Sequence, residues 1–199
     1  MKVSKEQASA NRQTILETAA RLYRERGIGG VGVAEIMREA GFTHGGFYGH
    51  FDSKEALAAE ACELAFSAPL ARLQDTLAKH HGDATPYFNN YLRLQHRDTP
   101  GTGCPMPTLA VDAGREPGPL VDAITSGISG YLNTFASHRP DGSVTDEPSE
   151  ADKARAIVVL SALVGGMVLA RATASGAPAL SDEILKTLQS EVSGLWKNG

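Results

Sequence analysis

The 199-residue sequence predicts an all-α protein of about nine helices, and three observations support this prediction. Apolar residues recur at spacings of three and four, the period of a helix that buries one face. The segments between these stripes are rich in Gly, Pro and Asp, as helix connections usually are. No run of alternating β-branched residues lies between them to indicate a strand.

The first half of the chain contains the most clearly delimited helices. An apolar stripe predicts a helix over roughly residues 10–26, closed by Gly27. Residues 33–40 read as a short second helix, and a long helix is expected to begin near Ser53. The apolar stripe of that long helix consists of Cys62, Phe66, Leu70, Leu73 and Leu77.

In the second half, helices are indicated by apolar stripes and by capping residues at their N-termini. A helix is expected after Pro86, and a clear apolar stripe runs through residues 121–135. Ser149 and Asp152 resemble a capping box that opens a further helix. Ser181 is predicted to cap the last helix, because acidic residues follow it in the first turn.

The charge distribution excludes a uniformly basic nucleic-acid coat protein. Residues 1–55 carry 8 Lys or Arg and 7 Asp or Glu, whereas residues 56–199 carry 11 and 16. Only the N-terminal quarter could therefore approach phosphate without repulsion. The chain has 2 cysteines, too few for a disulfide framework, which fits a reducing compartment.

Nothing in the sequence predicts a membrane or secretory protein. The longest uncharged apolar stretch, Ala156–Ala170, has 15 residues, and a bilayer span needs about 20. The segment Met1–Gln7 lacks the apolar stretch of a signal peptide. We therefore expect a cytoplasmic protein without a membrane partner, in which residues 156–170 form a buried helix.

Residues 33–51 have the pattern of a helix-turn-helix. Gly41 permits a left-handed turn after the first helix, Phe42 is expected in the core, and Thr43 is expected to cap the second helix. Two helices joined by such a short turn form the unit whose second helix lies in the major groove of DNA.

This region resembles the TetR family of transcriptional regulators over about 45 residues, of which Arg12–Gly27 corresponds to the family's first helix. The family's signature is matched by Tyr48, Gly49, His50 and Phe51, followed by Ser53, Lys54, Glu55 and Leu57. The resemblance implies a DNA-binding domain at residues 1–52 and an effector-binding and dimerisation domain at residues 53–199. It also implies a homodimer formed through the last two helices and an operator of double-stranded DNA.

The resemblance also assigns roles to individual residues. Tyr48, His50 and Lys54 would contact backbone phosphates, which position the domain without reading sequence. Base edges would be read by Thr43, His44 and Gly46. An N-terminal arm with Lys2, Lys5 and Arg12 is expected to contribute to specificity.

Two departures from the family pattern affect this domain. Gly32 stands where the family often has Thr, so that one capping hydroxyl is missing. Gly45, Gly46 and Gly49 each weaken a helix by about 1 kcal/mol relative to Ala. We therefore expect packing of Phe47 and Phe51 to hold this segment, with full ordering on DNA.

Cys104 lies in a loop rich in Pro and Gly, just before a short expected helix. The amides of a helix N-terminus lower the pKa of a thiol and make it nucleophilic. Gly103-Cys104, followed by Leu109, Ala110 and the acid Asp112, also resembles a subgroup of TetR-like repressors, some of which sense electrophiles or oxidants through that Cys. The alternative is a small, inert, buried residue at a tight turn, since Pro105 removes one amide.

The helical body offers apolar residues for an effector pocket, among them Tyr91, Met106, Tyr131 and Phe135, although aromatic residues at helical spacing usually form core. His80 and His81 lack metal-ligand spacing, so we predict neither a metal nor another cofactor. Gly165 and Gly166 interrupt an apolar helix, which indicates close helix packing, either in a four-helix dimer interface or within one subunit.

The resulting prediction is a homodimeric repressor that a small-molecule effector, or modification of Cys104, releases from its operator. One rival is an all-helical thiol enzyme with Cys104 as nucleophile and His96 as base. A second is a DNA-binding protein without any effector. We expect no enzymatic activity, because the first rival leaves residues 33–57 unexplained.

Overall fold

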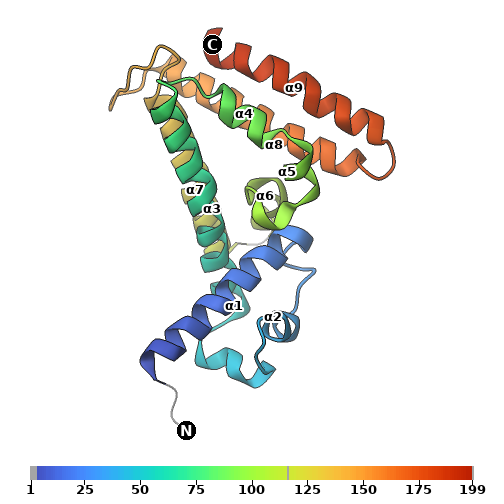
Figure 1. Ribbon diagram of the computed structural model, residues 1–199. Helices are drawn as coiled ribbons and strands as arrows, with labels where there is room; N and C mark the ends of the chain where they lie inside the picture. The colour runs from blue at the N-terminus through green and yellow to red at the C-terminus, as the bar shows by residue number, and fades with distance from the viewer. Residues whose placement is uncertain (1–3, 116, 199) are drawn as a thin grey trace. The chain divides into compact units, whose positions relative to one another are not determined.

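The computed structural model describes residues 4–115 and 117–198, and within these ranges it contains nine α-helices and two 3₁₀ helices (Figure 1). The predicted all-α fold is therefore confirmed. The elements are α1 (Lys5–Arg26), α2 (Val33–Glu39), η1 (His44–Gly49), α3 (Lys54–Lys79), α4 (Thr85–Tyr91), α5 (Leu94–Asp98), η2 (Pro100–Thr102), α6 (Met106–Ala113), α7 (Pro119–Ser137), α8 (Glu150–Thr173) and α9 (Pro178–Asn198).

These helices divide into two compact units. The first consists of the chain up to Ser67 together with Pro100–Ser126, and the second of Ala68–Thr99 together with the chain from Gly127. Helices α3 and α7 each begin in the first unit and end in the second. The functional division into residues 1–52 and 53–199 stays a prediction.

In the first unit, α1 is the longest helix that lies wholly within the unit. It begins at Lys5, earlier than predicted, because the Ser4 side chain accepts a hydrogen bond from the Gln7 amide and caps the helix. It ends at Gly27, whose φ of 74° lies in the left-handed region that favours glycine. The buried core side chains of α1 and α2 include Ile15, Leu22, Tyr23, Ile36 and Met37.

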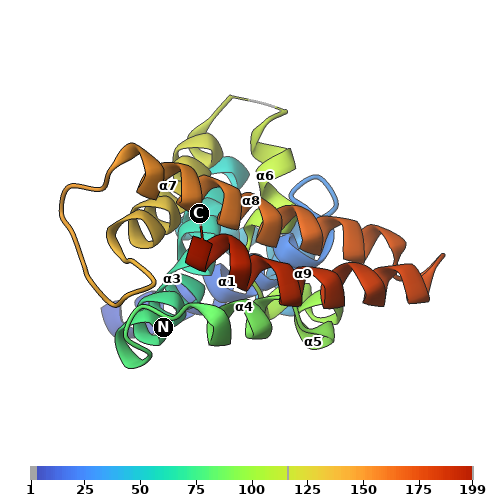
Figure 2. The same ribbon diagram turned by 90° about the horizontal axis from the view of Figure 1, so that it is seen from above.

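In the second unit, α8 and α9 lie side by side along most of their length (Figures 1 and 2). The predicted capping box at the start of α8 is confirmed, since Ser149 and Asp152 exchange side-chain and backbone hydrogen bonds. Trp196 of α9 is fully buried, and its indole N–H donates to the carbonyl of Gly82 at 3.0 Å. This hydrogen bond ties the C-terminal helix to the turn that follows α3.

The prediction that Ser181 caps the last helix is wrong. Helix α9 begins three residues earlier, at Pro178. Ser181 is fully buried, and its hydroxyl donates to the carbonyl of Ala170 and accepts from Arg97. Hydrogen bonds to residues far away in the sequence therefore explain why a serine stands here. The local sequence alone resembles that of a helix cap.

Helix α8 carries the long apolar run identified in the sequence. Among the described residues, it is the one helix long and apolar enough to cross a membrane by length and composition. One face is buried, including Val159, Leu163 and Met167, as expected of a core helix. The opposite face, which includes Ile157 and Leu169, is exposed although apolar.

Asp152 is the centre of a buried ionic network at the start of α8. Its carboxylate accepts hydrogen bonds from Arg139 at 3.0 Å, Arg155 at 2.7 Å and the Ser149 hydroxyl at 2.7 Å. These donors hold the pKa of Asp152 far below its ordinary value, Arg139 most strongly. The guanidinium of Arg155 also lies over the Trp196 ring, 5.1 Å from its centroid.

We expect Asp152→Ala to lower the free energy of unfolding at pH 7 by about 3 kcal/mol, because it leaves the buried Arg155 unpaired. A carboxylate with a depressed pKa stabilises the fold above its unfolded pKa of about 4, and this contribution disappears as the pH falls below that value. The difference between wild type and variant should therefore shrink in urea titrations between pH 5 and pH 3. Lys153→Ala, which removes only an exposed ion pair, is the control. A difference that is the same at both pH values would contradict this role.

Candidate nucleic-acid interface

The turn between α2 and η1 has the geometry that the sequence predicts. Gly41 has φ of 84°, and its amide donates to the carbonyl of Arg38 at 3.0 Å. The Phe42 amide donates to the carbonyl of Met37 at 2.8 Å. Together these hydrogen bonds form the paired closure of a helix that ends in a left-handed glycine. The chain therefore turns sharply and directs η1 away from α2.

The second element of the helix-turn-helix is a 3₁₀ helix over His44–Gly49. Its three glycines favour α-helix poorly, which accounts for the tighter, shorter form. Thr43 occupies the capping position but makes no side-chain cap hydrogen bond, so the predicted cap is absent. Here the segment His44–Gly49 is named the reader segment.

Two buried aromatic rings hold the reader segment in place. Phe47 has 0% exposure and stacks on Phe51, with 5.8 Å between the ring centroids. The adjacent Tyr48 is 71% exposed and packs its edge against Phe47. Consecutive positions of one short helix thus face opposite ways, with Phe47 in the core and Tyr48 in solvent.

The predicted base-reading residues all lie on the exposed side. Thr43, His44 and Gly46 are exposed, and a side-chain carbon at Gly46 would make only ordinary contact with Met37. His50 is half-buried at the end of the segment, and its carbonyl accepts a hydrogen bond from Arg12. The structure therefore brings Thr43, His44, Gly46 and Tyr48 together on one accessible element.

The predicted cations are more constrained than the sequence indicates. The ammonium of Lys54 donates to the carbonyl of Ile28 at 2.8 Å. One guanidinium nitrogen of Arg12 donates to both carboxylate oxygens of Glu60, each at 2.7 Å. The guanidinium also lies over the Phe51 ring, 4.4 Å from its centroid. Arg12 is thus a structural clamp of the helix-turn-helix. Lys2, also predicted for the arm, lies outside the described residues.

Cys104 lies buried in the first unit, with 2% exposure. The carbonyl of Gly103, next to it, accepts a hydrogen bond from the Arg24 guanidinium of α1 at 3.0 Å. Cys62 of α3 is fully buried, and burial together with the nearby Cys104 raises its pKa to about 12. Neither Cys62 nor Cys104 forms a disulfide bond in the structure.

Three of the four predicted effector residues belong to one aromatic cluster in the second unit. Tyr131 and Phe135 are fully buried, and Tyr87, absent from the prediction, links the cluster through a 3.0 Å hydrogen bond between its hydroxyl and that of Tyr131. The rings of Tyr91 and Phe135 also contact Tyr87. Met106 belongs to the first unit, as does Cys104.

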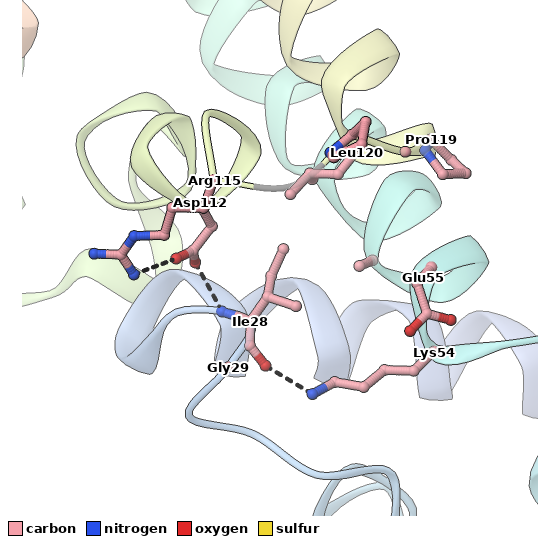
Figure 3. A pocket seen from close by; sticks show the side chains of 11 residues that line it. Ile28, Gly29, Lys54, Glu55, Asp112, Arg115, Pro119 and Leu120 are labelled. Atoms are coloured by element: carbon pink, nitrogen blue, oxygen red, sulfur yellow. Dashed lines mark hydrogen bonds and ion pairs between the residues drawn. The ribbon is translucent and has the colours of Figure 1, made fainter.

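A contact that the sequence analysis missed links α6 to the turn after α1. One carboxylate oxygen of Asp112 accepts a hydrogen bond from the Ile28 amide at 2.9 Å (Figure 3). Asp112 appeared in the sequence only as the acid of the Gly-Cys pattern, and no local signal pairs it with a residue 84 positions away. Among the described residues, no group of three or more His, Cys, Asp or Glu side chains could hold a metal.

A helix-turn-helix near the N-terminus of a helical chain defines a class of DNA-associated proteins. The sequence model described as "Bacterial regulatory proteins, tetR family" matches residues 15–61, which contain this motif. The matched segment includes α2, the reader segment and the start of α3.

Individual relatives agree with this match. The chain is 39% identical over 64 residues to the HTH-type transcriptional regulator AcrR of Shigella flexneri, a match covering 32% of this chain and 30% of AcrR. It is 29% identical over 113 residues to the HTH-type transcriptional repressor DhaR of Mycobacterium sp. (strain GP1), covering 57% of this chain and 55% of DhaR. The chain thus matches from under a third to about half of the length of these relatives.

The likeness in fold extends over most of the chain. The reduced form of E. coli NemR superposes with a TM-score of 0.74 at 22% identity, covering 93% of this chain and 96% of NemR. Residues 15–61 therefore resemble the TetR family of bacterial regulatory proteins, and the fold of the chain resembles that of solved TetR-family regulators. The reported relatives are described as transcriptional regulators, the class that the sequence predicts in preference to a thiol enzyme. Membership of the Gly-Cys subgroup stays a prediction.

Proposed function

We propose that the protein is a cytoplasmic, DNA-binding transcriptional repressor that acts as a homodimer. The observation that carries this proposal is the reader segment, in which the buried Phe47 fixes the exposed His44 and Tyr48 on one accessible surface. A short element presented in this way fits the major groove of double-stranded DNA. The match of residues 15–61 to a sequence model of bacterial regulatory proteins supports the same conclusion.

Within this proposal the residues have two kinds of role. Tyr48, His50 and Lys54 contact backbone phosphates and set the position of the domain. Thr43 and His44 read base edges, while Gly46 lets the backbone approach them closely. The phenol of Tyr48 supports its role, because it extends from a fixed helix into solvent.

The homodimer is proposed to form through α8 and α9. Exposed apolar side chains follow one face of α8, where Ile157, Val158, Val168 and Leu169 lie at helical spacing. Leu180 and Leu195 are exposed on α9. Several exposed apolar side chains on one face of a helix are typical of an interface between subunits.

The sequence left two roles open for the glycines of α8, close packing within one subunit and close packing at a dimer interface. We propose that Gly166 has the first role and Gly165 the second. A side-chain carbon on Gly166 would overlap Leu188 of α9, so Gly166 permits close packing within one subunit. A carbon on Gly165 would meet nothing within 4 Å. Gly165 is exposed on the apolar face, which supports a role in close approach of the second subunit.

Regulation is proposed to act through a small-molecule effector that favours one spacing of the two reader segments. On DNA, the two recognition elements of such a dimer lie about 34–36 Å apart. An effector that binds the non-matching shape more tightly withdraws the dimer from the operator. The candidate effector residues are Tyr91, Tyr131 and Phe135, whose cluster contains the paired buried hydroxyls of Tyr87 and Tyr131, and Met106 of the first unit.

Modification of Cys104 is the second candidate for release. The supporting observation is that its turn contacts α1 directly, through Gly103 and Arg24. Because Cys104 is only 2% exposed, a reagent would reach the thiol only when the turn opens.

We expect Tyr48→Ala to weaken operator binding about tenfold without changing the unfolding midpoint, because Tyr48 contributes to contact rather than to the core. His44→Ala should change operator preference. Operators selected from genomic fragments, followed by fluorescence anisotropy at several salt concentrations, measure both effects. The logarithm of affinity should fall steeply with the logarithm of the salt concentration. The control for Tyr48→Ala is Val144→Ala, since Val144 is 64% exposed and Tyr48 is 71% exposed. Unchanged binding by both reader variants, or a flat salt dependence, would sink the proposal.

The dimer interface predicts opposite outcomes at the adjacent glycines. Gly165→Glu should convert the dimer to a folded monomer, because it places bulk and charge on the apolar face. Gly166→Ala should lower the free energy of unfolding by about 1–3 kcal/mol through overpacking against Leu188. Analytical ultracentrifugation and thermal unfolding separate the two effects, with Lys186→Glu of α9 as the exposed control. A dimeric Gly165→Glu variant would exclude this face as the interface.

The Cys104 proposal is tested by N-ethylmaleimide, whose double bond the thiolate attacks to form a carbon–sulfur bond while the adjacent carbon takes up a proton. Wild type and Cys62→Ser should slowly lose operator affinity on treatment, whereas Cys104→Ser should keep it. Mass spectrometry gives the extent of labelling, and anisotropy gives the affinity. Equal losses in wild type and Cys104→Ser would exclude Cys104 as the sensor.

A further inference from the structure

Helix α6 is tied to the C-terminal end of α1 by polar contacts along its whole length. Before α6 begins, Arg24 of α1 donates to the carbonyl of Gly103 at 3.0 Å. Within α6, the hydroxyl of Thr108 donates to the carbonyl of Arg24 at 3.1 Å. At the end of α6, Asp112 accepts the amide of Ile28. All of these residues belong to the first compact unit.

The backbone of Ile28 is held from two sides. Asp112 of α6 accepts its N–H at 2.9 Å, and Lys54 of α3 donates to its carbonyl at 2.8 Å, as Figure 3 shows. Gly27 makes room for this arrangement, because a side-chain carbon there would lie 3.1 Å from a carboxylate oxygen of Asp112. Two helices far apart in the sequence therefore meet at one residue of the turn.

This turn leads directly to α2 and then to the reader segment. It contains Gly27, Gly29 and Gly30, and glycines lose more conformational entropy on ordering than other residues. The following helix has Gly32 at its N-cap and no side-chain cap hydrogen bond. Because local sequence restrains the turn so weakly, the contacts from Asp112 and Lys54 supply restraint that the segment lacks.

The contact is bordered by open space. Asp112 and Lys54 both line a cavity of about 350 Å³, whose other walls include Ile28, Pro119 and Leu120 (Figure 3). Side chains beside a cavity have fewer close contacts to hold them than side chains in a packed core. The hydrogen bond between Asp112 and Ile28 therefore lies beside a cavity and not within a fully packed core.

We propose that Asp112 is a positioning residue for DNA binding, which holds α2 and the reader segment in their binding geometry through the Ile28 amide. Because α6 begins two residues after Cys104, it connects that turn to the reader segment. This inference rests on the proposed function, since it concerns how the same DNA-binding surface is oriented. The ion pair of Asp112 with Arg115 does not account for Asp112, because its 3.5 Å separation and the 71% exposure of Arg115 make it weak.

The test compares Asp112→Ala with the conservative Asp112→Asn and the control Arg115→Ala. Asp112→Ala should weaken operator binding about tenfold at every salt concentration and leave the salt slope unchanged, because no phosphate contact is lost. Hydrogen exchange of the Ile28 amide should accelerate at least tenfold, while the amides of α8 exchange as in wild type. Asp112→Asn keeps an acceptor and should restore most of the affinity, and Arg115→Ala should bind as wild type does.

Lys54→Met separates the two roles of Lys54 in the same assay. A shallower salt slope indicates a phosphate contact, and an unchanged slope with weaker binding indicates that Lys54 acts through Ile28. Wild-type affinity in Asp112→Ala, unaltered exchange at Ile28, or equal losses in the Ala and Asn variants would overturn the positioning role. If the wild type binds no DNA, the proposed function is wrong. The exchange rate of the Ile28 amide in wild type and in Asp112→Ala still tests whether Asp112 restrains the turn.

Discussion

The burial of Phe47 against Phe51 is the interaction on which the candidate DNA-binding surface depends. The reader segment has three glycines and only six residues, so its own hydrogen bonds cannot keep it helical in water. Its shape therefore depends on the burial of the Phe47 and Phe51 rings in the core of the first unit. Arg12 reinforces this support, since it covers the Phe51 ring, pairs with Glu60 and caps the carbonyl of His50.

The sequence predicted those features that depend on neighbouring residues. The Ser149–Asp152 capping box and the left-handed Gly41 each follow from residues within a few positions, and both are present. The Ser181 cap failed because a buried serine held by Ala170 and Arg97 has the same local pattern as a capping serine. Pattern alone cannot separate these two environments, since the deciding partners lie on other elements.

The candidate site was predictable in its exposed residues and not in its supports. His44 and Tyr48 could be placed because the motif spans consecutive residues, and the structure puts them on one accessible surface. Lys54 bonds to Ile28, which is 26 positions away, and Arg12 bonds to Glu60, which is 48 positions away. Such pairs depend on how the helices pack, which a single sequence does not encode as a local pattern. The sequence therefore locates the reader segment but not what orients it.

The weak positive charge of this surface makes orientation decisive. The N-terminal quarter has almost balanced charge, and Arg12 and Lys54, two of the cations predicted to contact DNA, already have partners within the protein. A single reader segment then gains little from attraction to phosphate, and tight binding requires that both segments of a dimer engage at once. Binding of both segments raises the affinity only when their spacing and orientation match the two half-sites of the DNA. A small error in orientation therefore weakens the contacts at both half-sites. DNA binding by the proposed dimer would therefore depend more on the restraint of the glycine-rich turn than binding by a strongly basic surface does. In this protein that restraint lies in the carboxylate of Asp112 and the ammonium of Lys54, on either side of one residue.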